Sequence, residues 1–216
     1  MSLLIVAATE LEIKPIINLM NGEADFLIHG MGAGSTSYHI TKKICANSYD
    51  LVIQTGIAGT YEGGPMLGEA VGVISDRYAD LGIEEKGMIT PLEKAGFAAF
   101  DQHPFTNGCL LNPWVSKWNV HDLRMVKAAT VNLIHDDMNR TQKLVDQFHP
   151  EIETMEGAAF HQVCIMENIP FLQIRGISNH VGVRDKSRWK MDQAIESTVD
   201  AVRQIITRFK SDMLWK

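Results

Sequence analysis

Short apolar runs that alternate with helical periodicity constrain the fold of this chain more than any other feature. Runs of four to eight apolar residues favour buried strands, and a period near 3.6 in the segments that follow favours helices. This alternation predicts a largely parallel or mixed sheet with helices on both faces, an α/β fold in which ligands bind beyond the carboxyl ends of the strands. Strands are expected over 3–8, 25–29, 51–55, 69–75 and 170–178, and helices over 10–20, 35–47 and 191–210.

Length and composition favour one domain over residues 1–216. The chain is 45% hydrophobic, which is enough for one sizeable core at this length. No repeat or low-complexity linker divides it, and the segment 82–113, with scattered glycines and prolines, is the expected irregular insertion.

Charge and cysteine content exclude several classes of function. A net charge of −6 gives no basic surface for nucleic acid, and the apolar N-terminus is too short for a membrane span and has no preceding positive charge. Cys45, Cys109 and Cys164 have neither a disulfide pattern nor zinc spacing, and no histidine pair has ligand spacing. We therefore expect a cytoplasmic protein without a metal or another cofactor.

Glu12 lies where the first predicted strand passes into the first helix. Thr9 and Glu12 have the spacing of a capping box, which would make Glu12 a local stabiliser of that helix. The same position is the carboxyl edge of the sheet, where a carboxylate can deprotonate water. Both interpretations stay open at this point.

Two glycine clusters follow predicted strands. The cluster 30–34 lacks the spacing of a dinucleotide-binding loop, because position 35 is a serine. The cluster 56–59, which contains Ile57, Ala58 and Gly59, is expected to be a second turn at a strand end. Such turns either serve the backbone alone or let it approach a ligand closely.

Met155 and Glu156 stand between a β-like run and a helix. A carboxylate accepts hydrogen bonds from vicinal hydroxyls, and a thioether packs on a sugar face, so the pair suits a ribose. The alternative is a solvated glutamate in the first turn of a helix, where the helix dipole favours it.

The segment 175–185 ends a predicted strand and is the most informative motif. Asn179 has an amide donor and acceptor but no proton to give, which fits a recognition group better than an acid. Arg184, Arg188 and Trp189 follow in a polar segment. Asn179 could instead cap a turn, and Trp189 could be a packing residue.

Taken in this order, these motifs resemble the superfamily of purine nucleoside phosphorylases and 5′-methylthioadenosine/S-adenosylhomocysteine nucleosidases over essentially the whole chain. The runs 56–59, 79–82 and 177–189 are more narrowly similar to the futalosine hydrolases of the alternative menaquinone pathway. This resemblance implies a three-layer αβα fold with a mixed, partly barrel-like sheet. It also implies hydrolysis of the N-glycosidic bond of futalosine, a purine nucleoside, by a homodimer.

The resemblance also assigns roles to individual residues. It implies that Glu12 activates water, that Met155 and Glu156 hold the ribose, and that Asn179 contacts the departing base. Trp189 has the spacing of an aromatic residue over the 5′ substituent, where Arg184 or Arg188 could pair with a carboxylate. The remaining substrate-binding candidates are Ile57, Ala58, Gly59, Asn132 and Leu133.

One departure from the methylthioadenosine enzymes predicts the base. They have an aspartate where this chain has Asn179, and an amide can donate to O6 or N7 of hypoxanthine, whereas an ionised carboxylate cannot. Ile57 also replaces the serine that those enzymes usually have. Hydrolysis is favoured over phosphorolysis because no arginine precedes Arg77, which leaves few phosphate ligands in the early loops.

Three alternatives remain. They are a methylthioadenosine/adenosylhomocysteine nucleosidase that releases adenine, a purine nucleoside phosphorylase, and a nucleoside-binding protein without catalysis. The presence of both Glu12 and Glu156 argues against the last of these.

Overall fold

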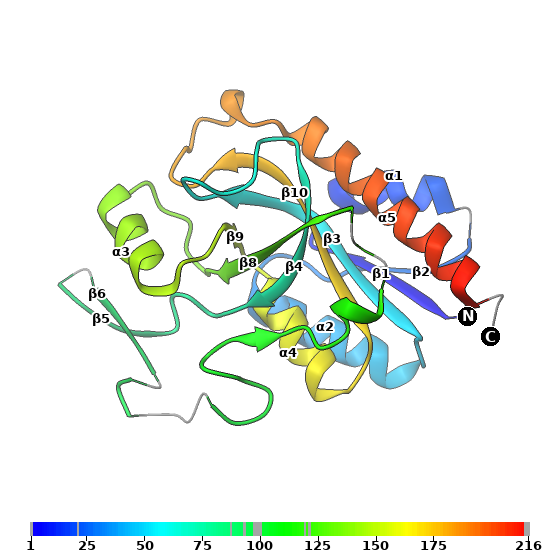
Figure 1. The fold of residues 1–216 in the computed structure, drawn as a ribbon, viewed down its shortest axis with the longest axis horizontal. Coiled ribbons are helices and arrows are strands. Elements are labelled where there is room, and N and C mark those ends of the chain that lie inside the picture. Colours follow the sequence, from blue (N-terminus) through cyan, green and yellow to red (C-terminus); the bar gives the residue numbers. More distant parts are fainter. Residues whose placement is uncertain are drawn as a thin grey trace.

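A computed structural model describes residues 2–20, 22–86, 88–92, 94–96, 101–118, 120 and 122–213, with the backbone alone for 210–213. Five strands of its main sheet form a ring in the order β10-β4-β8-β9-β3, because β10 also pairs with β3 (Figure 1). β1 and β2 extend the sheet beyond β3, and β7 pairs with β4. The strands are β1 (Leu3–Ala7), β2 (Asp25–Ile28), β3 (Leu51–Thr60), β4 (Ala70–Asp76), β7 (Leu110–Leu111), β8 (Arg124–Thr130), β9 (Ile152–Thr154) and β10 (Phe171–His180).

The pairing is mixed. β3 runs parallel to β1 and β10, and β8 runs parallel to β4 and β9. The pairs β3–β9 and β10–β4 are antiparallel. The partly barrel-like mixed sheet expected from the resemblance is confirmed.

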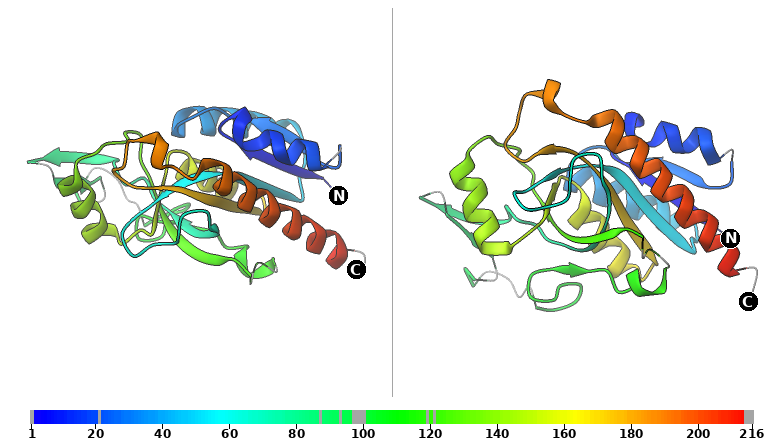
Figure 2. Two further views of the ribbon diagram at one scale, coloured as in Figure 1. Left: turned by 90° about the horizontal axis from the view of Figure 1, so that it is seen from above. Right: turned by 45° about the horizontal axis from the view of Figure 1, so that its top comes forward.

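Helices cover both faces of the sheet, as Figure 2 shows. Helices α1 (Glu10–Met20) and α5 (Met191–Met213) pack on one face with Leu3 and Ile5, and α2 (Ala33–Ala46) and α4 (Gly157–Met166) pack on the other with Leu4 and Val6. The alternation of β1 side chains between two cores follows from the period of two in a strand. The three-layer αβα prediction is therefore confirmed.

The remaining elements are a helix, a hairpin and two short 3₁₀ helices outside the main sheet. Helix α3 (Met138–Phe148) contacts a hairpin of β5 (Gly82–Glu85) and β6 (Met88–Pro91). Two short 3₁₀ helices are η1 (Val115–Lys117) and η2 (Lys186–Arg188). No helix in the described part of the chain is both long and apolar enough to cross a membrane.

Most predicted elements are confirmed within two residues at each end, apart from the carboxyl ends of β3 and of the last helix, and one prediction is wrong. The expected turn at 56–59 does not exist, because β3 continues through it to Thr60. β10 on one side and β9 on the other supply hydrogen-bond partners there, and this pairing overrides the local preference of glycine for turns. The irregular insertion at 82–113 contains the β5–β6 hairpin and β7, and its residues 87, 93 and 97–100 lie outside the described part.

Candidate active site

Glu12 lies in the first turn of α1 and bridges two elements. Its Oε2 accepts hydrogen bonds from the backbone N–H of Thr9 at 3.0 Å and from the Thr9 hydroxyl at 2.7 Å. Its Oε1 accepts one from the backbone N–H of Ile57 on β3 at 3.0 Å. The side chain is 8% exposed. The hydrogen bond from the Thr9 N–H to Glu12 is one of the two bonds of the expected capping box. The other carboxylate oxygen, Oε1, is bound by β3 instead.

Gly56 makes room for two charged side chains. A Cβ at residue 56 would lie 2.7 Å from Oε1 of Glu12 and 2.7 Å from Nη1 of Arg175. Its φ of 155° is also rarely adopted by residues with a side chain. The missing side chain therefore lets a carboxylate and a guanidinium approach the same point at the carboxyl edge of the sheet.

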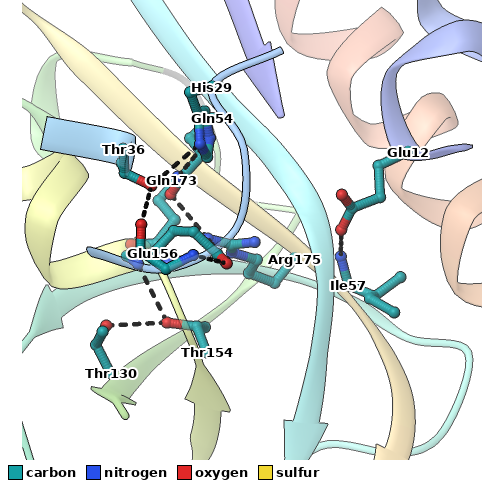
Figure 3. A network of polar contacts seen from close by, with 12 residues as sticks. Glu12, His29, Thr36, Gln54, Ile57, Thr130, Thr154, Glu156, Gln173 and Arg175 are labelled. Atoms are coloured by element: carbon teal, nitrogen blue, oxygen red, sulfur yellow. Dashed lines mark hydrogen bonds and ion pairs between the residues drawn. The ribbon is translucent and has the colours of Figure 1, made fainter. Parts of the chain in front are cut away.

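Glu156 brings a second carboxylate to Arg175. It occupies the N-cap of α4 and is buried, and its Oε1 accepts a hydrogen bond from the backbone N–H of Gly32 at 3.0 Å. Its Oε2 lies 3.9 Å from Nη2 of Arg175 (Figure 3). Burial raises the pKa of Glu156, which the Arg175 charge and the Gly32 hydrogen bond oppose and the nearby charge of Glu12 reinforces.

Arg175 is held from behind by a buried chain of polar groups, which Figure 3 shows. Its Nη2 donates to Oε1 of Gln54 at 2.8 Å, and the Gln54 amide lies 3.2 Å from Nε2 of His29. His29 Nδ1 lies 2.8 Å from the carbonyl oxygen of Gly30. Burial lowers the pKa of His29 to about 4, so the ring is neutral at pH 7. Nδ1 then donates to Gly30, and Nε2 accepts from Gln54.

A second buried network anchors the start of α4. The Thr130 hydroxyl donates to Asp76 at 2.8 Å and accepts from the backbone N–H of Ala158 at 2.8 Å. The Thr154 hydroxyl accepts from the N–H of Gly157 at 3.2 Å. Burial raises the pKa of Asp76 to about 6. These contacts satisfy the first N–H groups of α4 and so fix the position of Glu156 at its N-cap.

Asn179 lies near the carboxyl end of β10, beside Gly59 of β3. Its Oδ1 accepts from the Ser178 hydroxyl at 2.8 Å, and its Nδ2 donates to the His180 carbonyl oxygen at 3.0 Å. A Cβ at residue 59 would lie 3.4 Å from this Nδ2. The amide is therefore oriented over a glycine and keeps one N–H for a ligand.

Other candidates differ in their burial and contacts. Met155 precedes Glu156 and is half-buried, whereas the Ala58 side chain belongs to the core inside the ring. Asn132 is tied to Asp80 through its backbone N–H at 2.6 Å, and Leu133 is 57% exposed beside it.

The segment after β10 carries the three remaining candidates. Trp189 closes η2, and its Nε1 donates to the Val183 carbonyl oxygen at 2.9 Å. Arg184 and Arg188 are exposed, and the charge of Arg184 lowers the pKa of Glu153 on the neighbouring strand β9. Trp189 thus folds this segment back on itself, and the two arginines stay available to a ligand.

The structure adds residues to the site that the motifs did not single out. Arg175 was noted only as part of the last motif, and Gly32 only as part of a glycine cluster. A charged residue in an otherwise apolar strand was the signal for Arg175, because an isolated charge is buried only with partners. Within the described residues, no three His, Cys, Asp or Glu side chains gather in a way that could hold a metal ion.

Comparisons with known proteins identify the family and the fold. A family model described as "Phosphorylase superfamily" matches residues 16–211. A futalosine hydrolase of Thermus thermophilus is 30% identical over 84% of this chain and 80% of its own length. A 5′-methylthioadenosine/S-adenosylhomocysteine nucleosidase of Maridesulfovibrio salexigens is 25% identical over 88% of this chain and 83% of its own length. The structure of a futalosine hydrolase mutant of Helicobacter pylori has the same fold, with a TM-score of 0.80 and 16% identity over 96% of this chain and 99% of that one.

Proposed function

The chain belongs to the phosphorylase superfamily, and we propose that within it the protein hydrolyses the N-glycosidic bond of futalosine, releasing hypoxanthine and dehypoxanthine futalosine. It is an N-glycosyl hydrolase that acts on a small purine nucleoside. The observation that carries the mechanism is the placement of Arg175 between two carboxylates: its Nη1 and Oε1 of Glu12 both pack against Gly56, and its Nη2 lies 3.9 Å from Oε2 of Glu156.

In this mechanism, Glu12 is the general base for the attacking water. Oε1 of Glu12 is held by the Ile57 N–H and packs against Gly56, as the Arg175 guanidinium does, and the attacking water is assigned to this carboxylate. The oxygen of this water forms a bond to C1′ while Glu12 takes one of its protons. Arg175 is a positioning residue, because its positive charge offsets the repulsion between the carboxylates of Glu12 and Glu156.

Glu156 and Met155 bind the ribose. The Glu156 carboxylate is bound by the backbone N–H groups of Gly32 and Met155 and pairs with Arg175, and its two oxygens together accept more hydrogen bonds than these. The vicinal hydroxyls of a ribose supply the missing donors. As positive charge develops on the sugar, the negative charge of Glu156 stabilises it more strongly than it stabilises the ground state.

Asn179 receives the base. As the bond from C1′ to N9 breaks, the electron pair goes to the purine, and the free N–H of Asn179 stabilises the resulting anion by donating to O6 or N7. Asn179 has no proton to transfer, so the purine takes its proton from water after it leaves. A 6-oxopurine suits this mechanism because its anion is a better leaving group than that of adenine.

Trp189 and the two arginines of the segment after β10 are assigned to the 5′ substituent of futalosine. An indole offers an apolar face to an aryl ketone, and Arg184 or Arg188 offers a bidentate partner to its carboxylate. We assign Asn132 and Leu133, which lie just after β8, to binding of the purine. We further propose that the protein is a cytoplasmic single-domain homodimer that needs no cofactor, as its resemblance to the nucleosidases implies.

The test is chromatographic detection of the free base in phosphate-free buffer with futalosine, methylthioadenosine and inosine as separate substrates. Hypoxanthine from futalosine alone is the expected result. Adenine from methylthioadenosine with intact futalosine would replace this proposal with the adenine-releasing activity, and a requirement for phosphate would replace it with phosphorolysis.

A further inference from the structure

Glu153 lies on the same face of the sheet as Asn179, with only Gly59 between them. In the antiparallel pair β3–β9, Gly59 is opposite Glu153, and in the parallel pair β10–β3 it is opposite Asn179. Ala58 and Ile152, one residue earlier on their strands, point into the core of the ring. Because side chains alternate along a strand, Glu153 and the missing side chain of Gly59 point to the outer face.

The contacts of these side chains agree with this placement. The Tyr61 hydroxyl, two residues after Gly59, donates to Oε2 of Glu153 at 2.9 Å. A Cβ on Gly59 would meet Nδ2 of Asn179 and Cγ2 of Val181. Tyr61 and Val181 belong to one apolar cluster on this face. The Glu153 carboxylate and the Asn179 amide therefore lie on one face of the sheet, and the Asn179 amide and the Val181 side chain pack over the glycine between them.

Glu153 and Asn179 stand on β9 and β10, the two strands that flank β3. Two strand spacings of about 4.8 Å separate the backbones of Glu153 and Asn179. The base that the proposed function places against Asn179 must therefore approach Glu153. Oε1 of Glu153 accepts no hydrogen bond from any residue that the structure describes, so it is available to a donor on that ring.

We propose that Glu153 is a specificity-determining residue that accepts the N1–H of a 6-oxopurine while Asn179 donates to O6 or N7. This inference rests on the proposed function. Hypoxanthine has an acceptor at O6 and a donor at N1, whereas adenine has a donor at its 6-amino group and an acceptor at N1. In its ionised form, above its pKa, a carboxylate that the Tyr61 hydroxyl already orients rejects an acceptor at N1, because both atoms then lack a proton.

Neighbouring charges tune this carboxylate. Burial raises the pKa of Glu153 to about 7, with a further rise from Asp80, while the Tyr61 hydrogen bond and the charge of Arg184 lower it. A ligand N–H favours the ionised form of such a group, so binding of a 6-oxopurine draws a proton off Glu153.

The test measures binding of the free bases hypoxanthine and 1-methylhypoxanthine, which lacks the N1–H, to the wild-type protein and to Glu153→Leu. We expect the wild-type protein to bind hypoxanthine about 10- to 100-fold more tightly than the methylated base. Glu153→Leu should bind both bases within about threefold of each other, since the acceptor is gone. Glu151→Leu is the matched control, because Glu151 lies two residues earlier, bonds to Arg124 and should leave the ratio unchanged.

Tyr61→Phe is the second variant, which keeps the test decisive if Glu153→Leu does not fold. It leaves the carboxylate in place without its hydroxyl partner, and the ratio should fall by about three- to tenfold. A folded Glu153→Leu or Tyr61→Phe protein with the wild-type ratio would overturn the proposal, as would a wild-type protein that binds both bases alike. If the binding ratio contradicts this proposal but futalosine is still cleaved, the proposed function stands. If the protein neither releases nor binds a purine, the role of Glu153 and the proposed function are both wrong.

Discussion

The carboxylate of Glu156 accepts a hydrogen bond from the backbone N–H of Gly32 at 3.0 Å, although 124 positions separate the two residues in the chain. This contact joins the starts of α2 and α4, two helices on the same face of the sheet. It fixes one oxygen of the carboxylate that we assign to the ribose. The activity therefore depends on how accurately the helices are held, as well as on the chemistry of each side chain.

Glu12→Gln should lower kcat by about 10²–10⁴-fold, because an amide cannot take the proton of the attacking water. Binding of hypoxanthine should change little, since an amide oxygen can still accept from the Ile57 N–H, while stability should fall by about 1 kcal/mol because the amide nitrogen cannot accept from the Thr9 N–H. Steady-state kinetics with futalosine measures the loss. The matched control is Glu10→Gln on the exposed side of the same turn, where Glu10 pairs with Lys14. A Glu12→Gln enzyme with a tenth or more of wild-type kcat would rule out the role as base.

Gly56→Ala should lower kcat by more than about 10²-fold and the free energy of unfolding by about 1–3 kcal/mol. The new Cβ would displace the Glu12 carboxylate and the Arg175 guanidinium, each 2.7 Å away. Gly34→Ala in α2, where no atom lies within 4 Å, is the control and should be neutral or stabilising. Denaturant unfolding and kinetics are measured on both variants. Equal activity of the two variants would show that the close approach of Glu12 and Arg175 to Gly56 is not needed for catalysis.

Asn179→Asp should shift preference from futalosine to 6-amino-6-deoxyfutalosine by at least about tenfold in the ratio of kcat/KM. The new oxygen lies where Nδ2 now donates to the His180 carbonyl, which favours a protonated carboxyl that can give its proton to N7 of adenine. Activity of the variant on the amino substrate should then fall as the pH rises through the pKa of this carboxyl. An unchanged substrate ratio would contradict the role of Asn179 in base recognition.

Asp76→Asn should change how stability depends on pH. The folded-state pKa of Asp76, about 6, lies above its ordinary value of 3.8, so its contribution to stability is full below about pH 3.8 and is lost as the pH rises through 6. The variant lacks this loss, and its stability relative to wild type should rise between pH 4 and 7 by on the order of 2–3 kcal/mol. Thermal unfolding of both proteins across this range measures the difference, with the exposed Asp50→Asn as control. If the stabilities of Asp76→Asn and wild type depend on pH in the same way, the raised pKa of Asp76 is contradicted.

Arg188→Ala should raise KM for futalosine by about three- to thirtyfold and leave hypoxanthine binding unchanged, because it removes a partner of the substrate carboxylate but no contact to the base. Arg203→Ala on α5, where Arg203 pairs with Asp200, is the control. If KM stays at the wild-type value in both Arg188→Ala and Arg184→Ala, neither arginine binds this carboxylate.

Much of the fold followed from the pattern of apolar residues, and part of the site followed from local chemistry. Glu12 and Glu156 were predicted because each stands where a strand passes into a helix, a position that the sequence marks directly. Arg175 was not singled out, because only the register of β10 against β3 brings it to Gly56. The turn expected at 56–59 was wrong for the same reason, since pairing with two distant strands decides the conformation there.

The pairing of β10 with β3 closes the ring along the strands that carry Arg175 and Asn179. Breaking this seam would cost many backbone hydrogen bonds at once, so it does not open on the time scale of a catalytic cycle. Any motion that admits substrate or releases the purine is therefore expected in connecting segments such as 131–137 and 181–190 rather than in this seam. Substitutions in such segments can change turnover without altering a single group that takes part in the chemistry.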